Sequence, residues 1–103
     1  MEYFKQIAGH FKDGKREEGL KIIAELWSEN VGKVKGLSAF VLMANLHDSQ
    51  GATNSTVWET KEDMDAYYSQ DKNNQSVLDR MKPMMEEALE RREYTIFKSK
   101  MKE

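Results

Sequence analysis

The chain contains no cysteine, a single proline and two histidines among its 103 residues. The lack of cysteine excludes disulfides, thiolate nucleophiles and cysteine-ligated metal sites. No apolar run reaches the roughly 18 residues that a membrane-crossing helix needs. Residues 1–6 also lack the basic-then-apolar pattern of a secretion signal. We therefore expect a cytoplasmic protein that does not contact a membrane.

A strong charge of one sign is missing too. Sixteen basic and eighteen acidic side chains leave a formal net charge of -2. Proteins that bind nucleic acid or an anionic membrane surface usually carry a basic patch, so neither partner is expected here. The lysine-containing segment 98–102 is interpreted as a solvated strand end, with phosphate binding as the alternative.

The hydrophobic pattern that is present predicts one α+β domain over residues 1–103. Strands are expected at 3–12, 37–47, 53–60 and 93–101, where apolar, aromatic and β-branched residues gather between turn signals. Helical patterns separate the first strand from the second and the third from the fourth. This βαββαβ order predicts a ferredoxin-like fold, with a four-stranded antiparallel sheet and both helices on one face.

Each helical region has recognisable limits. The first follows a turn at Asp13–Gly14, which offers an N-cap, and ends before Gly32. Its apolar positions recur three and four residues apart: Leu20, Ile23, Ala24, Trp27 and Val31. The second begins at Thr60, which forms a pattern similar to a capping box with Asp63. After a polar stretch at 71–75 it is expected to continue over 77–89, where Pro83 kinks it or starts a new piece.

The second strand is apolar on both faces, which a sheet with one solvated face should not be. One face would carry Phe40, Leu42, Ala44 and Leu46, and the other Leu37, Ala39, Val41 and Met43. The helices can cover only one of these faces. A second copy of the sheet is the economical cover for the other, so we expect an isologous homodimer.

Three segments of the sequence, in this order, resemble the antibiotic-biosynthesis monooxygenase family. They are residues 13–20 at the entry to the first helix, residues 34–37 at the entry to the second strand, and the Trp-Glu segment 56–67. The resemblance implies a dimeric α+β barrel, in which two sheets pack face to face. It also implies a pocket for a small aromatic molecule between sheet and helices. Function within this family is diverse, so the reaction must be argued from the site.

One branch of that family oxidises phenolic compounds with neither metal nor flavin, so no cofactor is expected. The branch uses an Asn and a Trp four residues apart on the third strand, and Asn54 and Trp58 match both positions. Residues four apart on a strand share a face, and both side chains can donate a hydrogen bond. The match is incomplete, because Met64 replaces a Tyr and the later Arg falls near Leu78. Trp58 could equally be a sheet-packing aromatic, and Asn54 a strand-edge residue.

A second branch degrades haem, and its functional positions correspond to Ile7, Tyr67 and Val77. All three are changed, and no side chain remains at the position of the iron ligand, so neither haem nor another metal is expected. His47, near the end of the second strand, is the candidate general base, and His10 is a second possibility. The residues expected to line the pocket are Tyr67, Met64, Ile7 and Met81.

Three functions therefore stand as hypotheses. The first is a cofactor-independent monooxygenase acting on a small aromatic or quinol-like compound, with Asn54, Trp58 and His47 as catalytic residues. The second is a dimeric binding or stress-response protein of the same fold without catalysis. The third is an isomerase of small hydroxyketones that uses His47 as its base.

Overall fold

The computed structural model describes residues 2–70, 79–86 and 89–100. Its elements follow the predicted βαββαβ order. They are β1 (Tyr3–His10), α1 (Arg16–Asn30), β2 (Leu37–Ala44), β3 (Gly51–Trp58), α2 (Lys61–Ser69), the 3-10 helix η1 (Lys82–Met84) and β4 (Glu90–Thr95). The predicted α+β ferredoxin-like fold is confirmed.

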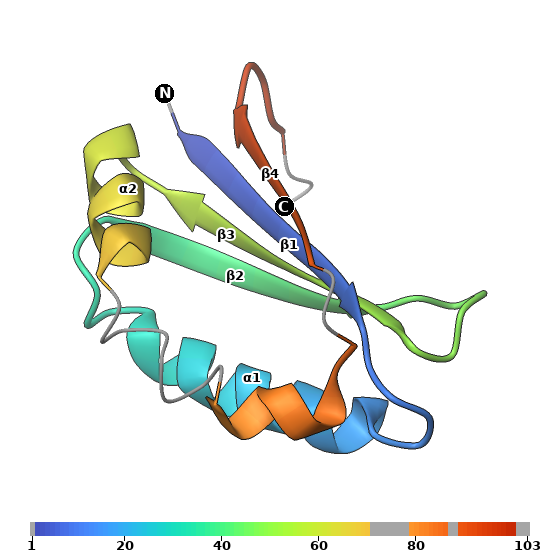
Figure 1. Ribbon diagram of the computed structural model, residues 1–103. Helices are drawn as coiled ribbons and strands as arrows, with labels where there is room; N and C mark the ends of the chain where they lie inside the picture. Colours follow the sequence, from blue (N-terminus) through green and yellow to red (C-terminus); the bar gives the residue numbers. More distant parts are fainter. Residues whose placement is uncertain (1, 71–78, 87–88, 101–103) are drawn as a thin grey trace.

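The four strands form one antiparallel sheet in the order β2-β3-β1-β4 (Figure 1). The third strand thus lies between the first and the second, as predicted. One core joins the sheet to both helices: Trp27 comes from α1, Met64 and Tyr67 from α2, and Trp58 from β3. Both helices therefore cover the same face of the sheet, which we call the helix face. The opposite side is called the outer face.

Helix α1 has the predicted apolar stripe, but its start differs from the prediction. Asp13 and Gly14 form a turn, and the N-cap position is Lys15, which makes no side-chain capping hydrogen bond. Gly14 has a φ of 75°, a left-handed value that glycine adopts without strain, so the turn delays the helix. Glu17 and Glu18 lie in the first turn, where carboxylates stabilise the positive end of the helix dipole.

Strand β2 contains an irregularity that changes one predicted face. The register shifts between Leu37, which pairs with Trp58, and Ala39, which pairs with Val57. The extra residue, Ser38, moves Leu37 to the helix face, where it is buried in the core. The predicted alternation placed Leu37 on the other face, and this was wrong because a bulge resets the two-residue period.

Strands β2 and β4 are shorter than predicted. β2 ends at Ala44, before His47, and β4 spans Glu90–Thr95 rather than 93–101. A strand extends only as far as its neighbour pairs with it. In β1, the residues that pair with β4 are those from Tyr3 to Ala8. Residues 98–100 are exposed beyond this pairing, and Met101 and Lys102 lie outside the described residues. The charged start of β4 suits an edge strand, because charges oppose pairing with other chains.

The second helical region is divided, and its later part is not the predicted long helix. Thr60 caps α2 by accepting a hydrogen bond from the Asp63 backbone N–H at 3.0 Å, as the capping box predicts. Residues 79–81 are helical, and Pro83 lies in η1. The prediction of helix as far as Leu89 was wrong, because Met85 is extended and forms an isolated bridge with Phe11. Residues 77, 78 and 88 lie outside the described part.

Candidate functional site

A single row of residues crosses the middle of the sheet on the helix face. Asn54 pairs with Leu42 on one side and with Ile7 on the other, and Ile7 also pairs with Arg91. Neighbouring strands lie about 4.8 Å apart, so the four backbones stand side by side. All four residues line one cavity.

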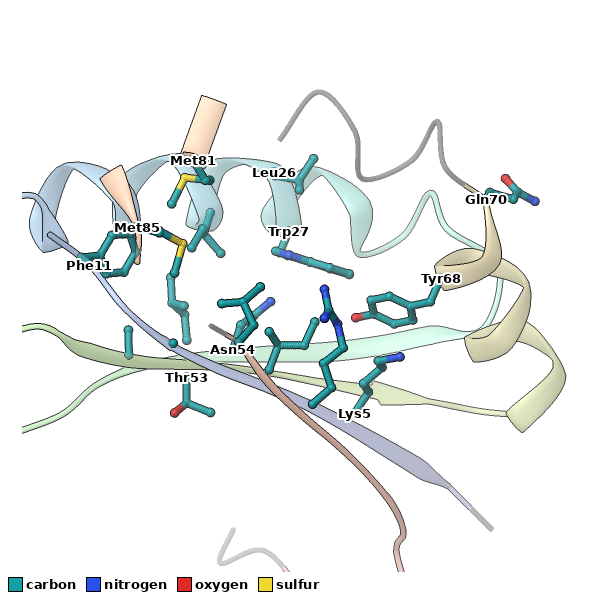
Figure 2. A pocket seen from close by; sticks show the side chains of 17 residues that line it. Lys5, Phe11, Leu26, Trp27, Thr53, Asn54, Tyr68, Gln70, Met81 and Met85 are labelled. Atoms are coloured by element: carbon teal, nitrogen blue, oxygen red, sulfur yellow. The ribbon is translucent and has the colours of Figure 1, made fainter. Parts of the chain in front are cut away.

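This cavity has a volume of about 460 Å³ and lies between the sheet, α1, the end of α2 and the segment that leads into β4 (Figure 2). Such a volume is typical of sites for small molecules. Its walls are mainly apolar: Ile7, Gly9, Phe11, Ile23, Leu26, Trp27, Leu42, Ala52, Met81, Met85 and Leu89. Its polar side chains are Lys5, Asn54, Tyr68, Gln70 and Arg91; Thr53 also lines it, but its side chain points away (Figure 2). The site therefore suits a flat apolar molecule that carries a few polar groups.

Asn54 projects its amide into the space below Trp27 (Figure 2). Its Oδ1 atom is buried and has no hydrogen-bond partner among the described residues. A buried amide oxygen without a partner costs about 1–3 kcal/mol. Such a cost is readily explained if a ligand supplies the missing partner. The two ends of an amide can exchange places, so Asn54 can offer either an acceptor or a donor.

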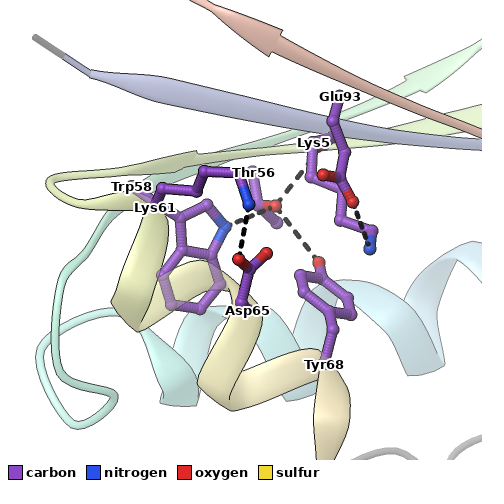
Figure 3. Close-up of polar contacts among 7 residues, drawn as sticks. All are labelled: Lys5, Thr56, Trp58, Lys61, Asp65, Tyr68 and Glu93. Carbon is purple, nitrogen blue, oxygen red and sulfur yellow. Dashed lines mark hydrogen bonds and ion pairs between the residues drawn. The ribbon is translucent and has the colours of Figure 1, made fainter.

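Trp58 shares the helix face with Asn54, as predicted, but it does not line the cavity. It is completely buried, and its indole N–H donates to the Thr56 Oγ1 atom at 2.9 Å (Figure 3). The same Thr56 oxygen lies 3.2 Å from the Tyr68 hydroxyl and 3.4 Å from the Lys5 carbonyl oxygen. All these groups are satisfied together if Tyr68 donates to Thr56 and Thr56 donates to the carbonyl. The Trp58 N–H is thus engaged inside the protein.

Tyr68 is the tyrosine of α2 that lines the cavity. Burial raises the pKa of Tyr68 to about 12, although its hydrogen bond with Thr56 opposes this change. The phenol is therefore neutral at physiological pH. It cannot serve there as the base that deprotonates a ligand.

The raised pKa of Tyr68 predicts a loss of stability in alkali. The folded-state pKa lies above the unfolded value of about 10, so its stabilisation is complete below pH 10 and is lost as pH rises toward 12. When the pH is raised from 9.5 to 11.5, the free energy of unfolding measured in urea should fall by about 2 kcal/mol more for wild type than for Tyr68→Phe. Tyr94→Phe, at a tyrosine that is 46% exposed, is the control and should keep the wild-type pH dependence. Equal losses in wild type and Tyr68→Phe would contradict the assignment.

Lys5 brings a nearly buried positive charge to the cavity. Its ammonium lies 3.1 Å from Glu93 Oε2 and 4.0 Å from the centre of the Tyr68 ring (Figure 3). A carboxylate and an aromatic face together make up for lost hydration of the ammonium. Arg91 adds a second positive charge from β4, beside Ile7.

The remaining predicted site residues divide between the cavity and other places. Ile7 and Met81 line the cavity. Met64 and Tyr67 are core residues, and the Tyr67 hydroxyl accepts a hydrogen bond from Asn30 at 3.1 Å. The core packs Tyr67 between Trp27 and Trp58, so Tyr68 takes the place in the cavity wall that was predicted for Tyr67.

Neither histidine belongs to the cavity. His47 is exposed in the connection between β2 and β3, because β2 ends before it. His10 is exposed and lies 2.8 Å from Asp48 at the same end of the sheet. Hydrogen bonds to Asp48, chiefly from the Gln50 backbone and also from His10, lower the pKa of its carboxyl. The structure gives the predicted general base no contact with the cavity.

Sequence reasoning missed Lys5 and Arg91. It expected one of Tyr67 and Tyr68 in the core and the other in the pocket wall, and it chose Tyr67 for the wall where the structure has Tyr68. Lys5 could have been found from the alternation of side chains along a strand: it stands two positions before Ile7 in the first strand, so the two share a face. Arg91 was hidden because β4 was expected to begin only at Glu93. Among the described residues, no group of three or more His, Asp or Glu side chains could hold a metal ion. The described helices include none long and apolar enough to cross a membrane.

The amino-acid sequence matches no family model and none of the curated proteins. Its fold, however, is similar to that of several solved structures. A proposed antibiotic biosynthesis monooxygenase from Chloroflexus aurantiacus is 20% identical, with a TM-score of 0.77 and 98% of each chain covered. Another, from Nitrosomonas europaea, is 14% identical with a TM-score of 0.79, covering 93% of this chain and 91% of that one.

SnoaB from Streptomyces nogalater, a cofactor-independent oxygenase, is similar as well. It is 12% identical, with a TM-score of 0.77 and 95% of each chain covered. The structural neighbours therefore include proteins of the antibiotic biosynthesis monooxygenase family, as the sequence resemblance suggested. At these identities the likeness shows a shared fold, and the reaction has to be argued from the cavity.

Proposed function

We propose that this protein binds a small phenolic or quinol-like aromatic compound in the helix-face cavity and oxidises it with dioxygen, without a cofactor. The observation that carries the proposal is the buried Oδ1 atom of Asn54, which has no hydrogen-bond partner among the described residues, in an apolar and aromatic cavity of small-molecule size. The similarity of fold to SnoaB, a cofactor-independent oxygenase, supports this type of reaction.

The proposed reaction requires no outside reductant. The phenol loses two hydrogen atoms and gains one oxygen atom to become a quinone, and the second atom of dioxygen leaves as water. The aromatic ring supplies all the electrons. The protein then has to bind the ring, exclude water and stabilise negative charge as oxygen is reduced.

Asn54 is the residue best placed to interact with the reacting oxygen. Its amide can donate to a phenolate or to a peroxide oxygen formed on the ring. No histidine or carboxylate is among the described residues that line the cavity. Lys5 and Arg91 instead favour the phenolate electrostatically, since a nearby positive charge lowers the pKa of an acid. Solvent can then accept the proton as the ring enters the cavity.

Asn54→Ala should reduce kcat/KM for oxygen uptake about 100-fold, because one hydrogen-bond donor to a developing oxyanion contributes roughly that much. Wild type, treated with chelator, is assayed with dihydroxynaphthalenes and menadiol in an oxygen electrode. Thr53→Ala is the matched control, since Thr53 is adjacent in the chain and points away from the cavity (Figure 2). The proposal fails if wild type is no faster than buffer across the panel.

The proposed active form is a homodimer that packs through the outer faces of two sheets. This face exposes apolar side chains on both edge strands: on β2, Val41 is 50% exposed and Met43 43%, and on β4, Tyr94 is 46% exposed. Phe4 lies beside Tyr94, with ring centres 5.9 Å apart. An exposed apolar face of this kind favours burial against an identical face, which would produce the dimeric α+β barrel expected from the sequence.

A binding protein without catalysis is the second candidate. It is favoured by the engaged indole N–H of Trp58 and by the lack of a histidine or carboxylate among the described cavity residues. Native mass spectrometry that detects a co-purified aromatic ligand, together with no turnover, would support it. An isomerase that uses His47 gains no support, because His47 lies outside the cavity.

A further inference from the structure

We propose that the cavity selects aromatic ligands that carry an anionic oxygen, such as a carboxylate, and that Arg91 is the residue that binds this group. The inference rests on the proposed function only in taking the same cavity as the ligand site. It adds a chemical class of ligand, and it can be tested without any turnover.

The pairing of β4 directs Arg91 toward the cavity. Arg91 stands opposite Ile7, and both residues line the cavity wall. The next residue, Arg92, stands opposite Gln6 and belongs to the outer face by strand alternation. Arg92 lies 3.4 Å from Glu90, whereas Arg91 forms no ion pair with any residue in the described part of the chain. Two consecutive arginines therefore occupy different environments.

Among the residues that the structure describes, the charges around this end of the cavity leave one positive charge in excess. Lys5 and Glu93 pair with each other at 3.1 Å. Helix α1 contributes Ile23, Leu26 and Trp27 to the wall, none of which is charged. Within the described part of the chain, Arg91 is thus the uncompensated charge, and its influence reaches Tyr68, whose pKa it lowers against the larger effect of burial. An arginine in this position can bind a carboxylate through two parallel hydrogen bonds.

The spacing of the polar groups describes the ligand further. Asn54 and Arg91 are separated by β1, so their backbones stand about 10 Å apart across the sheet. A bicyclic aromatic ring can rest over Ile7 between them. Its hydroxyl group would meet the Asn54 amide, and its anionic group would meet the guanidinium. The two polar groups would also fix the orientation of the ring.

The test uses 2-naphthoate and its neutral isostere 2-naphthamide, neither of which is a phenol. Binding is followed by quenching of Trp27 fluorescence, because Trp27 lines the cavity. Wild type should bind the carboxylate at least about tenfold more tightly than the amide at low salt, as expected for a charge-assisted pair. Arg91→Gln should remove this preference, while amide binding stays within about twofold. Arg92→Gln is the matched control and should keep the preference.

Three results would overturn the inference. They are equal affinities of wild type for the two compounds, a preference that survives Arg91→Gln, or no binding of either compound at millimolar concentration. Arg91 is exposed at the sheet edge, so its replacement should leave the fold intact, and unfolding in urea checks this. Equal affinities of wild type for the two compounds, together with clear oxygen uptake, would reject only this inference. A clear preference without any oxygen uptake would reject only the proposed oxidation.

Discussion

Replacing Trp58 by alanine should lower the free energy of unfolding by about 4 kcal/mol, the range for removal of a buried tryptophan. The side chain is completely buried and touches Tyr67 and Tyr68, with ring centres 5.6 Å and 6.0 Å away. Its loss opens a large void in the core and also deprives Thr56 of a hydrogen bond. Urea unfolding at fixed protein concentration measures the effect. Phe97→Ala, at a side chain that is 95% exposed, should change stability by less than about 0.5 kcal/mol.

The milder variant Trp58→Phe separates a core role from a catalytic one. It keeps most of the aromatic volume and removes the indole N–H. If the N–H acts only on Thr56, turnover of any accepted naphthol should stay within about threefold of wild type, while Asn54→Ala loses about 100-fold. A loss in Trp58→Phe as large as that in Asn54→Ala, with stability unchanged, would instead identify the indole as a donor to the substrate.

Val41→Glu should convert the proposed homodimer into a monomer at micromolar concentration. In an isologous dimer both subunits carry the substitution at the shared interface. One change therefore buries two carboxylates, each facing an apolar surface. Desolvation of each costs several kcal/mol, which should raise the Kd for dimerisation by at least about 1,000-fold. Light scattering coupled to size exclusion measures the mass. If wild type is itself a monomer at roughly 50–100 µM, well above the Kd of a stable dimer, the proposed dimer is wrong.

Val31→Glu is the matched control for this experiment. Val31 is also an exposed valine, at 37%, but it caps the C-terminal end of α1 and does not belong to the outer face. The variant should retain the mass of wild type. A monomeric Val31→Glu protein would mean that added charge alone, and not its position on the sheet, disrupts association.

Local sequence patterns were sufficient for the order of the elements and for the fold. The stripe from Leu20 to Trp27 and the Thr60 cap are determined by neighbours in the chain, so they could be predicted from residue types and spacing. The same is true of the shared face of Asn54 and Trp58, since the period of a strand is two. The apolar residues on both faces of β2 are equally evident from their alternation along the chain, although a bulge moves Leu37 to the other face.

The membership of the cavity was decided by tertiary structure. Asn54 and Trp58 share a face, yet one meets open space under α1 and the other is covered by α2, and no local pattern distinguishes these neighbours. Tyr67 and Tyr68 are likewise neighbours in α2, yet Tyr67 is buried in the core and Tyr68 lines the cavity. Arg91 joined the cavity because β4 pairs with β1 in one particular register. The sequence by itself thus determined the fold and its faces, because those depend on local periodicity. The composition of the site depends on which distant elements come to lie over each position, and only the folded chain settles that.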